Sequence, residues 1–274
     1  MRELFVLDKL LREEGKLPKH EAKAIIVDLD RTLLRTDKTI SDYTLQVLQK
    51  CHEKGLLLMV ATARPERAIT MYHEQVQFEA MTVMNGADVV FPGKGPGNRQ
   101  GNEIPRESVE VSLQRLCELP GVILSLECGN EVYANIEIPE WNAIVFTEFP
   151  KLPTEGPVYK ILVSRENENI GPLVANMLPE DTYCIVANDN LVQIMNKQAT
   201  KWNGIQMMLK SCGISPENAV YFGDDNDDIE PLKRCGTGVA VANAIDAVKE
   251  AADEVAESND EDGVAKWIER KLLV

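Results

Sequence analysis

The chain contains 274 residues and has a mass of 30.6 kDa, which is enough for one large domain or two modest ones with a substantial core. Hydrophobic residues make up 44% and charged residues 27% of the sequence, which excludes a disordered or fibrous chain. Asp and Glu number 44 against 29 Lys and Arg, so the formal net charge is −15. Because such an acidic surface repels phosphate backbones and anionic lipids, we expect neither a nucleic acid nor a membrane partner.

The N-terminus and the cysteines indicate the compartment. The longest apolar stretch, residues 55–61, is far shorter than the ~20 residues that span a bilayer. Residues 1–14 carry acidic residues among the apolar ones and lack the small-residue cleavage site of a secretory signal. The six cysteines form no C-x-x-C pair and have no histidine nearby, which argues against a zinc site or a disulfide framework. We therefore expect a cytoplasmic protein with reduced thiols.

Strand and helix signals alternate over the first 84 residues. Residues 23–30 form an apolar run that ends in acid, which is typical of a strand buried on both faces of a parallel sheet. Ser41 is a predicted N-cap, and Gly55 ends the helix that follows it. The predicted elements are an N-terminal helical extension at residues 1–22, strands at 23–30, 56–60 and 81–84, and helices at 41–54 and from 65 onward. This β-α-β-α-β order begins a doubly wound sheet.

The middle of the chain has a different character. Between residues 85 and 193 the elements are shorter and Gly and Pro are frequent, as in residues 91–97, which we interpret as a hairpin loop of an α+β insertion. Beyond residue 200 we predict strands at 219–222 and 238–241 and helices from 201 and from about 226, 244 and 261. The expected fold class is α/β. A mostly parallel, Rossmann-like core consists of residues 1–84 and 194–274, and a smaller α+β domain is inserted at residues 85–193.

Two carboxylates, Asp28 and Asp30, follow the first predicted strand. Alternate residues of an extended segment share a side, so both can face one site. Two like charges about 4 Å apart cost roughly 4 kcal/mol at an effective dielectric constant near 20. A metal ion, or a proton kept on one of the two, would relieve this repulsion. The alternative is that both carboxylates only cap the next helix.

The second predicted strand is followed by another polar cluster, residues 61–65. Its Thr62 offers a hydroxyl and a backbone N–H at the start of a helix, an arrangement that suits a phosphate oxygen. The alternative is that Thr62 serves only as an N-cap. Because the carboxyl ends of parallel strands meet at one edge of an open sheet, we expect this cluster to converge with Asp28 and Asp30.

Residues 223–228, Gly-Asp-Asp-Asn-Asp-Asp, follow the apolar strand at 219–222 and hold four carboxylates. Their place at the sheet edge argues against an ordinary solvated surface. Such hard oxygen ligands suit Mg²⁺ better than zinc. A cationic side chain is then needed to balance a substrate phosphate beside so many acids. Lys201, at the predicted start of a helix, is best placed by chain order, and Lys197 and Lys160 are its rivals.

Taken in this order, the motifs resemble those of the haloacid dehalogenase superfamily of phosphatases, specifically its Cof-like branch with a large α/β cap. The matching segments are Asp28-Leu-Asp-Arg-Thr-Leu33 to D-x-D-G-T-L, residues 61–64 to A-T-G-R, 85–87 to N-G-A, 200–202 to S-K-G, and 222–229 to F-G-D-x-x-N-D-I. The resemblance covers most of the chain from residue 24 onward. It implies that the inserted domain at residues 85–193 is the cap.

The resemblance also implies a role for each matching residue. Asp28 would be the nucleophile that forms an aspartyl-phosphate, and Asp30 the acid that protonates the leaving alcohol and then activates water. Thr62 and Lys201 would hold the transferring phosphoryl group, which completes the expected catalytic set. The expected substrate ligands are Thr62, Arg64, Lys201, Asn85 and Gly86, and the expected Mg²⁺ ligands are Asp28, the main-chain carbonyl of Asp30 and Asp224, with Asp228 supporting the ion through water.

Three residues depart from the family pattern. Arg31 replaces the Gly of the first motif and puts a large cation beside the nucleophile, where it either contacts substrate or points away. Ala63 replaces a Gly with no expected consequence. Asp227 stands where the family usually has Asn, so it adds charge that could alter metal affinity.

Together these residues predict a Mg²⁺-dependent phosphatase that acts on small phosphorylated metabolites, such as sugar phosphates, nucleotides or cofactor phosphates. One alternative is a phosphosugar mutase, which returns the phosphoryl group to a sugar. Another is a non-catalytic relative that binds a metabolite. We expect a monomer or a weak homo-oligomer.

Overall fold

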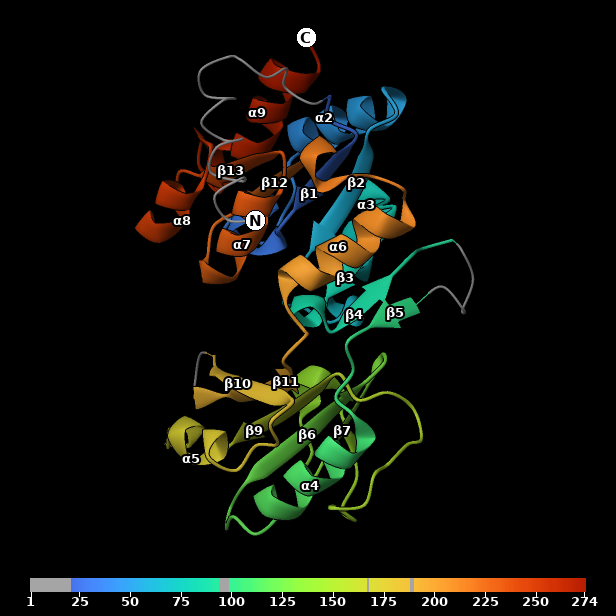
Figure 1. Ribbon diagram of the computed structural model, residues 1–274, viewed down its shortest axis with the longest axis vertical. Helices are drawn as coiled ribbons and strands as arrows, with labels where there is room; N and C mark the ends of the chain where they lie inside the picture. Colours follow the sequence, from blue (N-terminus) through green and yellow to red (C-terminus); the bar gives the residue numbers. More distant parts are fainter. Residues whose placement is uncertain (1–20, 94–98, 167, 188–189) are drawn as a thin grey trace.

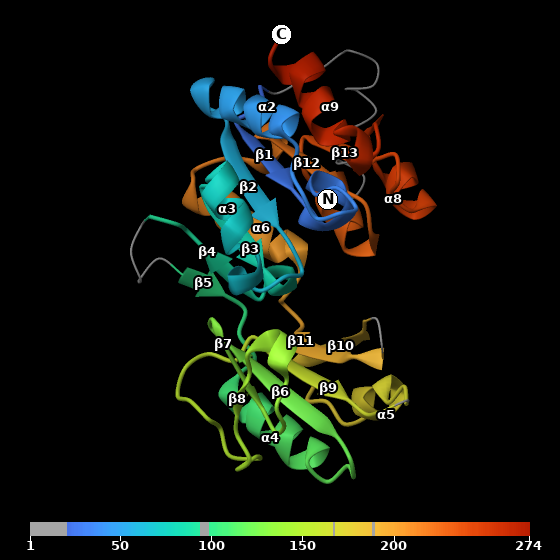
Figure 2. The same ribbon diagram turned by 180° about the vertical axis from the view of Figure 1, so that it is seen from behind.

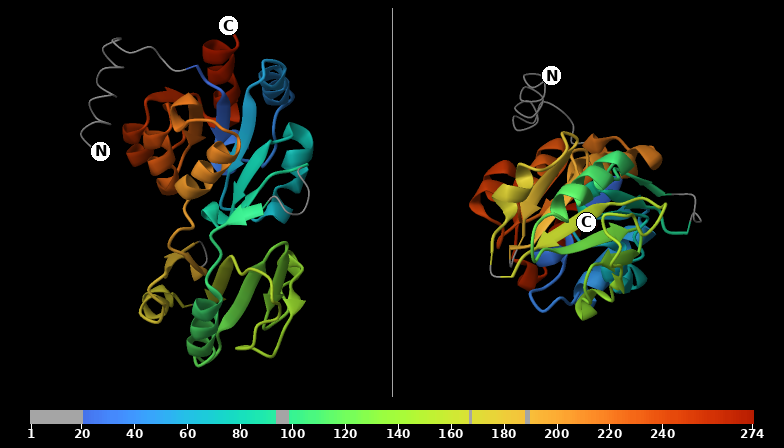
Figure 3. Two further views of the ribbon diagram at one scale, coloured as in Figure 1. Left: turned by 45° about the vertical axis from the view of Figure 1, so that its right-hand side comes forward. Right: turned by 90° about the horizontal axis from the view of Figure 1, so that it is seen from below.

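The computed structural model describes residues 21–93, 99–166, 168–187 and 190–274, and these form two bodies (Figure 1). The larger body holds an eight-stranded sheet and the C-terminus, and the smaller body holds a six-stranded sheet. Two chain segments join the bodies, one after β5 (Arg99–Gly101) and one before α6 (Lys201–Ser211), as Figure 3 shows. Residues 1–20, where we expect most of the N-terminal helix, lie outside the described residues.

The larger sheet is mostly parallel, as the sequence predicts. In spatial order its strands are β14 (Glu254–Ala256), β13 (Thr237–Val241), β12 (Ala219–Gly223), β1 (Ala24–Val27), β2 (Leu57–Ala61), β3 (Ala80–Val83), β4 (Asp88–Val90) and β5. The strands from β14 to β3 run parallel, and β4 pairs antiparallel with both of its neighbours, β3 and β5. The strand order reverses between β1 and β12, and ligands bind at such switch points in open α/β sheets.

Helices cover both faces of the larger sheet, which explains its apolar strands. One face carries α2 (Asp42–Glu53), α3 (Thr70–Val76) and α9 (Gly263–Leu272), and the other carries α6, α7 (Ile229–Arg234) and α8 (Asp246–Ala251), as Figures 1 and 2 show. The central residues of β1, Ile25 and Ile26, are almost completely buried. Ser41 caps α2 as predicted, because its hydroxyl accepts a 3.1 Å hydrogen bond from the N–H of Thr44.

The smaller sheet is antiparallel except at one edge and is covered by helices on one face. Its strands, in spatial order, are β10 (Thr182–Val186), β11 (Val192–Asn196), β9 (Lys160–Ser164), β6 (Ile123–Cys128), β7 (Glu131–Ala134) and β8 (Ile144–Val145). Two helices, α4 (Arg106–Leu116) and α5 (Gly171–Ala175), pack on it around a core that includes Leu113 and Ile161. Alternate residues of each strand therefore point away from these helices.

Some elements differ from the predicted ones. We place the beginning of the insertion at residue 85, but β4 pairs with β3, and β5 pairs with β4, in the larger sheet. Residues 91–93 of the predicted hairpin loop follow β4 in this sheet, and residues 94–98 lie outside the described residues. The helices predicted from residues 65 and 226 begin at Thr70 and Ile229, each after a short 3₁₀ turn. The short strand β14 carries a mixed polar pattern and is not predicted.

Both bodies of the described residues contain helices. None of these helices has both the length and the apolar composition that crossing a bilayer requires. All six cysteines lie in the described residues, and none of them forms a disulfide bond.

Candidate active site

The site lies where β1 and β12 end side by side, at the reversal of strand order. Val27 pairs with Phe222, and the N–H of Asp28 continues the ladder with a 3.0 Å hydrogen bond to the carbonyl of Phe222. Asp224 follows β12 at the same edge. The parallel register thus brings together carboxylates that lie almost 200 residues apart in the chain, as the sequence predicts.

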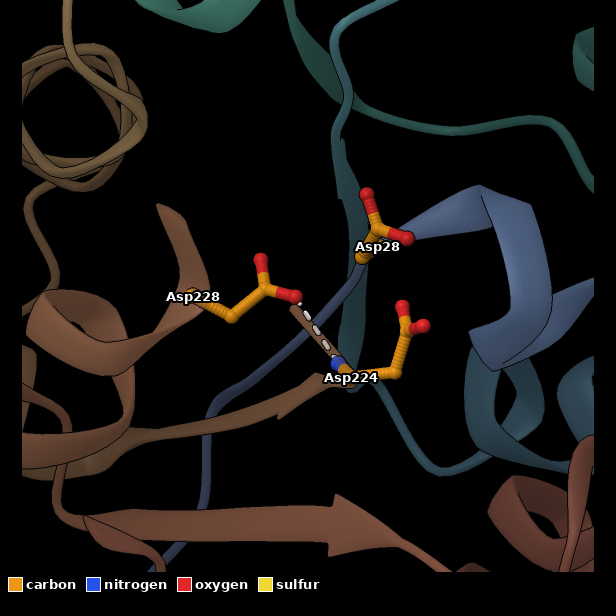
Figure 4. Close-up of side chains that lie close together, drawn as sticks. All are labelled: Asp28, Asp224 and Asp228. Atoms are coloured by element: carbon orange, nitrogen blue, oxygen red, sulfur yellow. Dashed lines mark hydrogen bonds between the residues drawn. The ribbon is translucent and has the colours of Figure 1, made fainter. Parts of the chain in front are cut away.

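Three buried carboxylates, Asp28, Asp224 and Asp228, form the centre of the site (Figure 4). One oxygen from each lies within 4.8 Å of the others. Figure 4 also shows the hydrogen bond that ties two of them together, from the N–H of Asp224 to Oδ2 of Asp228 at 2.8 Å. Because buried like charges repel and carboxylate oxygens are hard ligands, this donor set fits a divalent cation such as Mg²⁺.

Lys201, the first residue of α6, supplies the positive charge of this cluster. Its Nζ lies 2.8 Å from Asp28 Oδ1, 2.6 Å from Asp228 Oδ1 and 3.2 Å from Asp227 Oδ1. Burial disfavours the charged lysine, but the nearby carboxylates of Asp228 and Asp28 outweigh burial and raise the pKa of Lys201 well above its usual value. Burial also raises the pKa of Asp28 well above its usual value, although Lys201 opposes this shift. The structure therefore places Lys201, and not the exposed Lys197, beside the three carboxylates.

The carboxylate of Asp228 is occupied by protein donors on both oxygens. Its Oδ1 accepts from Lys201 and from the hydroxyl of Tyr221 at 2.6 Å. Its Oδ2 accepts from the N–H groups of Asp224 and Asp225. This close approach needs Gly223, because a Cβ atom there would lie 2.5 Å from the Cβ of Asp228. Tyr221 is not among the predicted residues, since in sequence it is one more large residue of a buried strand.

Asp224 and the turn after β1 contact each other. The hydroxyl of Thr32 donates a 2.9 Å hydrogen bond to Oδ1 of Asp224, and Nε of Arg31 lies 3.9 Å from Oδ2. Burial raises the pKa of Asp224 to about 6. Arg31 adopts a left-handed backbone with φ 61°, which explains why Gly suits this position in the family motif. The side chain of Arg31 thus lies beside the metal-ligand candidates while remaining 59% exposed.

Asp30 lies between two cations rather than inside the carboxylate cluster. Its oxygens accept from Nε and Nη2 of Arg64 at 2.6 and 2.7 Å and from Nζ of Lys38 at 2.7 Å. Burial alone would raise the pKa of Asp30, but the hydrogen bonds from Arg64 and Lys38 outweigh it and lower the pKa. In this arrangement Asp30 is an ionised carboxylate. Lys38 is not predicted as a site residue, because its contact depends on how the turn after residue 33 folds back.

The remaining predicted ligands occupy different positions. The N–H of Thr62 donates to the carbonyl of Thr82 at 2.9 Å. It is therefore not available to a phosphate, contrary to our prediction from the sequence. The Thr62 side chain is 1% exposed, and its hydroxyl accepts from the N–H of Arg64 at 3.2 Å. Gly86 packs on the start of α6, where a Cβ would lie 1.9 Å from the carbonyl oxygen of Thr200. A packing requirement therefore accounts for this glycine.

Asn85 joins the core site to the smaller body. Its Nδ2 donates to Oδ2 of Asp227 at 2.9 Å, and its Oδ1 accepts from Nζ of Lys160 at 3.1 Å. Asp227, the acid that replaces the usual Asn of the family, thus bridges Lys201 and Asn85. Lys160, a rival of Lys201 in the sequence, contributes to a separate part of the site.

Comparison with known proteins agrees with this geometry. The profile of the haloacid dehalogenase-like hydrolase family matches residues 25–268. The chain belongs to this family. The predicted resemblance to Cof-like haloacid dehalogenase proteins is thereby confirmed.

Relatives and solved structures extend the comparison. The 5-amino-6-(5-phospho-D-ribitylamino)uracil phosphatase of Bacillus subtilis is 30% identical over 89% of this chain and 95% of its own length. The pyridoxal phosphate phosphatase of Escherichia coli is 23% identical over 92% of this chain and 99% of its own length. A haloacid dehalogenase-like hydrolase from Bacteroides thetaiotaomicron superposes with a TM-score of 0.80 at 25% identity and covers 91% of this chain and 99% of that one.

The family and these relatives confirm the prediction of a phosphoric monoester hydrolase. The α/β fold class is confirmed as well. The expectations of a cytoplasmic location, of a monomer or weak homo-oligomer, and of no nucleic acid or membrane partner stay predictions.

Proposed function

We propose that this hydrolase is a Mg²⁺-dependent phosphatase of small phosphorylated metabolites that works through an aspartyl-phosphate on Asp28. The observation that carries the proposal is the buried cluster in which Lys201 contacts Asp28 and Asp228 next to Asp224. Phosphoryl transfer depends mainly on positioning and charge stabilisation, and this cluster provides both. The cluster lies at the switch point of the sheet, where ligands bind in open α/β folds.

The metal would be held mainly by Asp28 and Asp224. Asp228 already accepts two hydrogen bonds on each oxygen, which supports a role in positioning Lys201 and the loop or in holding a metal-bound water. When bound, Mg²⁺ supplies positive charge that lets the acids stay ionised beside a phosphate. The side chain of Asp30 is committed to Arg64 and Lys38, so this residue would offer the metal only its main-chain carbonyl.

The reaction would proceed in two displacements at phosphorus. In the first, an oxygen of Asp28 forms a bond to phosphorus while the bond to the leaving oxygen breaks, and the leaving oxygen takes up a proton. In the second, the ionised Asp30 would take a proton from water, the water oxygen attacks the same phosphorus, and Asp28 leaves as a carboxylate. Lys201 and the hydroxyl of Thr62, which still has its own proton to donate, would hold the phosphoryl oxygens throughout. Burial of Lys201 strengthens its attraction for that group.

Asp30 would deliver the proton to the leaving oxygen. Since Arg64 and Lys38 hold it ionised in this structure, the role requires Asp30 to leave these partners and pick up a proton when substrate binds. Its side chain is 37% exposed, so such a rotation meets little packing resistance. The smaller body would act as a cap that limits the entry of water during transfer.

The substrate class rests on the relatives. Their names specify a phosphorylated ribitylaminouracil and pyridoxal phosphate, both small phosphate monoesters. We infer that this chain takes phosphate monoesters of comparable size. A panel of phosphorylated metabolites, assayed by phosphate release, would identify the preferred member.

The experiment that tests the proposal is turnover of p-nitrophenyl phosphate with and without Mg²⁺. We expect turnover that requires the metal and that falls by ~10⁴-fold or more in Asp28→Asn, because the variant lacks the nucleophile. The exposed Asp225→Asn is the matched control, since it removes a carboxylate from the same loop, and it should keep most of the activity. Unchanged turnover in Asp28→Asn would overturn the mechanism.

A further inference from the structure

Lys160 is a buried lysine that the proposed reaction does not use. It is the first residue of β9 in the smaller body, and it is 4% exposed. Ile161 and Val163 of the same strand pack in the core under α4 and α5, so Lys160 lies on the opposite face of the sheet. From there its Nζ reaches the larger body, at 3.3 Å from the carbonyl oxygen of Ala63 and 3.1 Å from Oδ1 of Asn85.

The ammonium group of Lys160 has only neutral oxygen partners. Its third contact is Oε1 of Gln193 at 2.9 Å. Among the described residues it takes part in no ion pair within 4 Å. Burying a charge without a counter-ion costs free energy, so burial disfavours the charged form of Lys160. Burial accordingly lowers the pKa of Lys160 to about 8.

The two nearest carboxylates are engaged elsewhere. Glu127 lies opposite Lys160 in the register of β6 and β9, but both of its oxygens bind the guanidinium of Arg67, at 2.5 and 2.8 Å. Asp227 gives one oxygen to Lys201 and the other to Asn85. The positive charge of Lys160 is therefore left for a ligand. Gln193 is only partly buried and can yield its place.

The position of Lys160 relative to the reaction defines that ligand. Attacking and leaving oxygens lie roughly in line in phosphoryl transfer, so the leaving group points away from Asp28. Ala63 directly follows Thr62, and Asn85 is linked through Asp227 to Lys201. Lys160 thus borders the proposed phosphoryl site from the smaller body, which is the side that the leaving group faces.

We propose that Lys160 binds a second anionic oxygen, such as a carboxylate, on the leaving group, and that the preferred substrates are phosphate monoesters of hydroxy acids rather than of neutral polyols. This inference rests on the function proposed above. A ligand carboxylate would replace Gln193 or the carbonyl of Ala63 as a hydrogen-bond acceptor of Lys160. It would also supply the counter-ion that the protein does not provide.

The test compares pairs of substrates that differ by one carboxylate: 3-phosphoglycerate with glycerol 3-phosphate, and 6-phosphogluconate with sorbitol 6-phosphate. For the native enzyme with Mg²⁺ we expect a higher kcat/KM for the acid in at least one pair. In Lys160→Met the kcat/KM for that acid should fall by ~10 to 100-fold, as for the loss of a charge-assisted hydrogen bond, while that for the polyol changes by less than about 3-fold. The matched control is the exposed Lys197→Met, which should keep the preference.

The kinetics of Lys160→Met decide between a role in substrate preference and a general role at the phosphoryl site. Loss of the preference in Lys160→Met alone supports the inference. An equal loss on acid and polyol would overturn it and make Lys160 a positioning residue of the phosphoryl site. The inference is also overturned if the native enzyme turns over p-nitrophenyl phosphate but does not favour the acid in either pair. If the enzyme hydrolyses no phosphate ester at all, the proposed function itself fails.

Discussion

Two lysines, Lys201 in the larger body and Lys160 in the smaller one, are each 4% exposed, yet their surroundings are opposite. Three carboxylates lie within 3.2 Å of the ammonium of Lys201. Three neutral oxygens surround the ammonium of Lys160. The pKa of Lys201 is raised and that of Lys160 is lowered, although burial acts on both in the same direction.

This difference shows that the partners of a buried charge, and not burial itself, indicate its role. The charge of Lys201 is balanced by the protein and holds Asp28, the proposed nucleophile, and its neighbours in place before any substrate arrives. The charge of Lys160 is not balanced by direct contact, so it can be offered to a ligand. In the two proposals, the larger body carries out the chemistry and the smaller body selects the substrate, and this separation can be tested.

The largest expected effect is that of Lys201→Met. This change leaves buried carboxylates without their cation, so the free energy of unfolding should fall by on the order of 3 to 5 kcal/mol. Turnover of every phosphate ester should fall by ~10³-fold, because the phosphoryl group loses a positioned charge. Urea unfolding and steady-state kinetics measure the two effects, with Lys197→Met as control. A loss no larger than that of the control would remove Lys201 from the centre of the account.

An intermediate effect is expected in the pH dependence of stability. The pKa of Lys160 is about 8 in the folded chain, against a usual value of 10.5. Between these values the unfolded chain binds more protons than the folded one, so the contribution of Lys160 to the free energy of unfolding rises with pH. This contribution to the free energy of unfolding is fully present above pH 10.5, where Lys160 is neutral in both states. It is lost as the pH falls through about 8.

The measurement is urea unfolding of the native protein and of Lys160→Met from about pH 7.5 to 10.5. The difference in unfolding free energy between the two should change by about 3 kcal/mol in favour of the native protein over this range. If the unfolding free energies of the two proteins instead change with pH in the same way, the charge of Lys160 is balanced by the protein. The contrast with Lys201 would then disappear.

The smallest effect should come from Asp227→Asn, at the residue that links the two lysines. Asn can keep a hydrogen bond to Asn85, and Asp28 and Asp228 still hold Lys201. We therefore expect less than about 10-fold change in turnover of p-nitrophenyl phosphate and about 1 kcal/mol or less in stability. Steady-state kinetics and urea unfolding check both. A loss as large as that of Lys201→Met would place Asp227 in the catalytic machinery.

The convergence of Asp28, Asp224 and Lys201 could be predicted from sequence for a physical reason. The carboxylates follow buried parallel strands, and such strands place their ends at one edge of the sheet whatever the exact register. The apolar runs that mark these strands are long and unbroken, so the fold of the core follows from them as well.

Other contacts depend on details that sequence patterns do not carry. The hydrogen bond from Tyr221 to Asp228 depends on the loop folding back over Gly223. The hydrogen bond from Lys38 to Asp30 depends on how the turn after residue 33 folds back. The burial of Lys160 depends on how the two bodies dock, because its partners Ala63 and Asn85 belong to strand ends of the other sheet.

The central claim, that Asp28 accepts the phosphoryl group at this site, is tested most directly by adding beryllofluoride, a phosphoryl mimic that bonds to carboxylates, and recording fluorine NMR spectra. We expect a bound signal in the native protein only when Mg²⁺ is present. The signal should be absent in Asp28→Asn and retained in Lys160→Met. A bound signal in Asp28→Asn, or none in the native protein with Mg²⁺, would contradict the account.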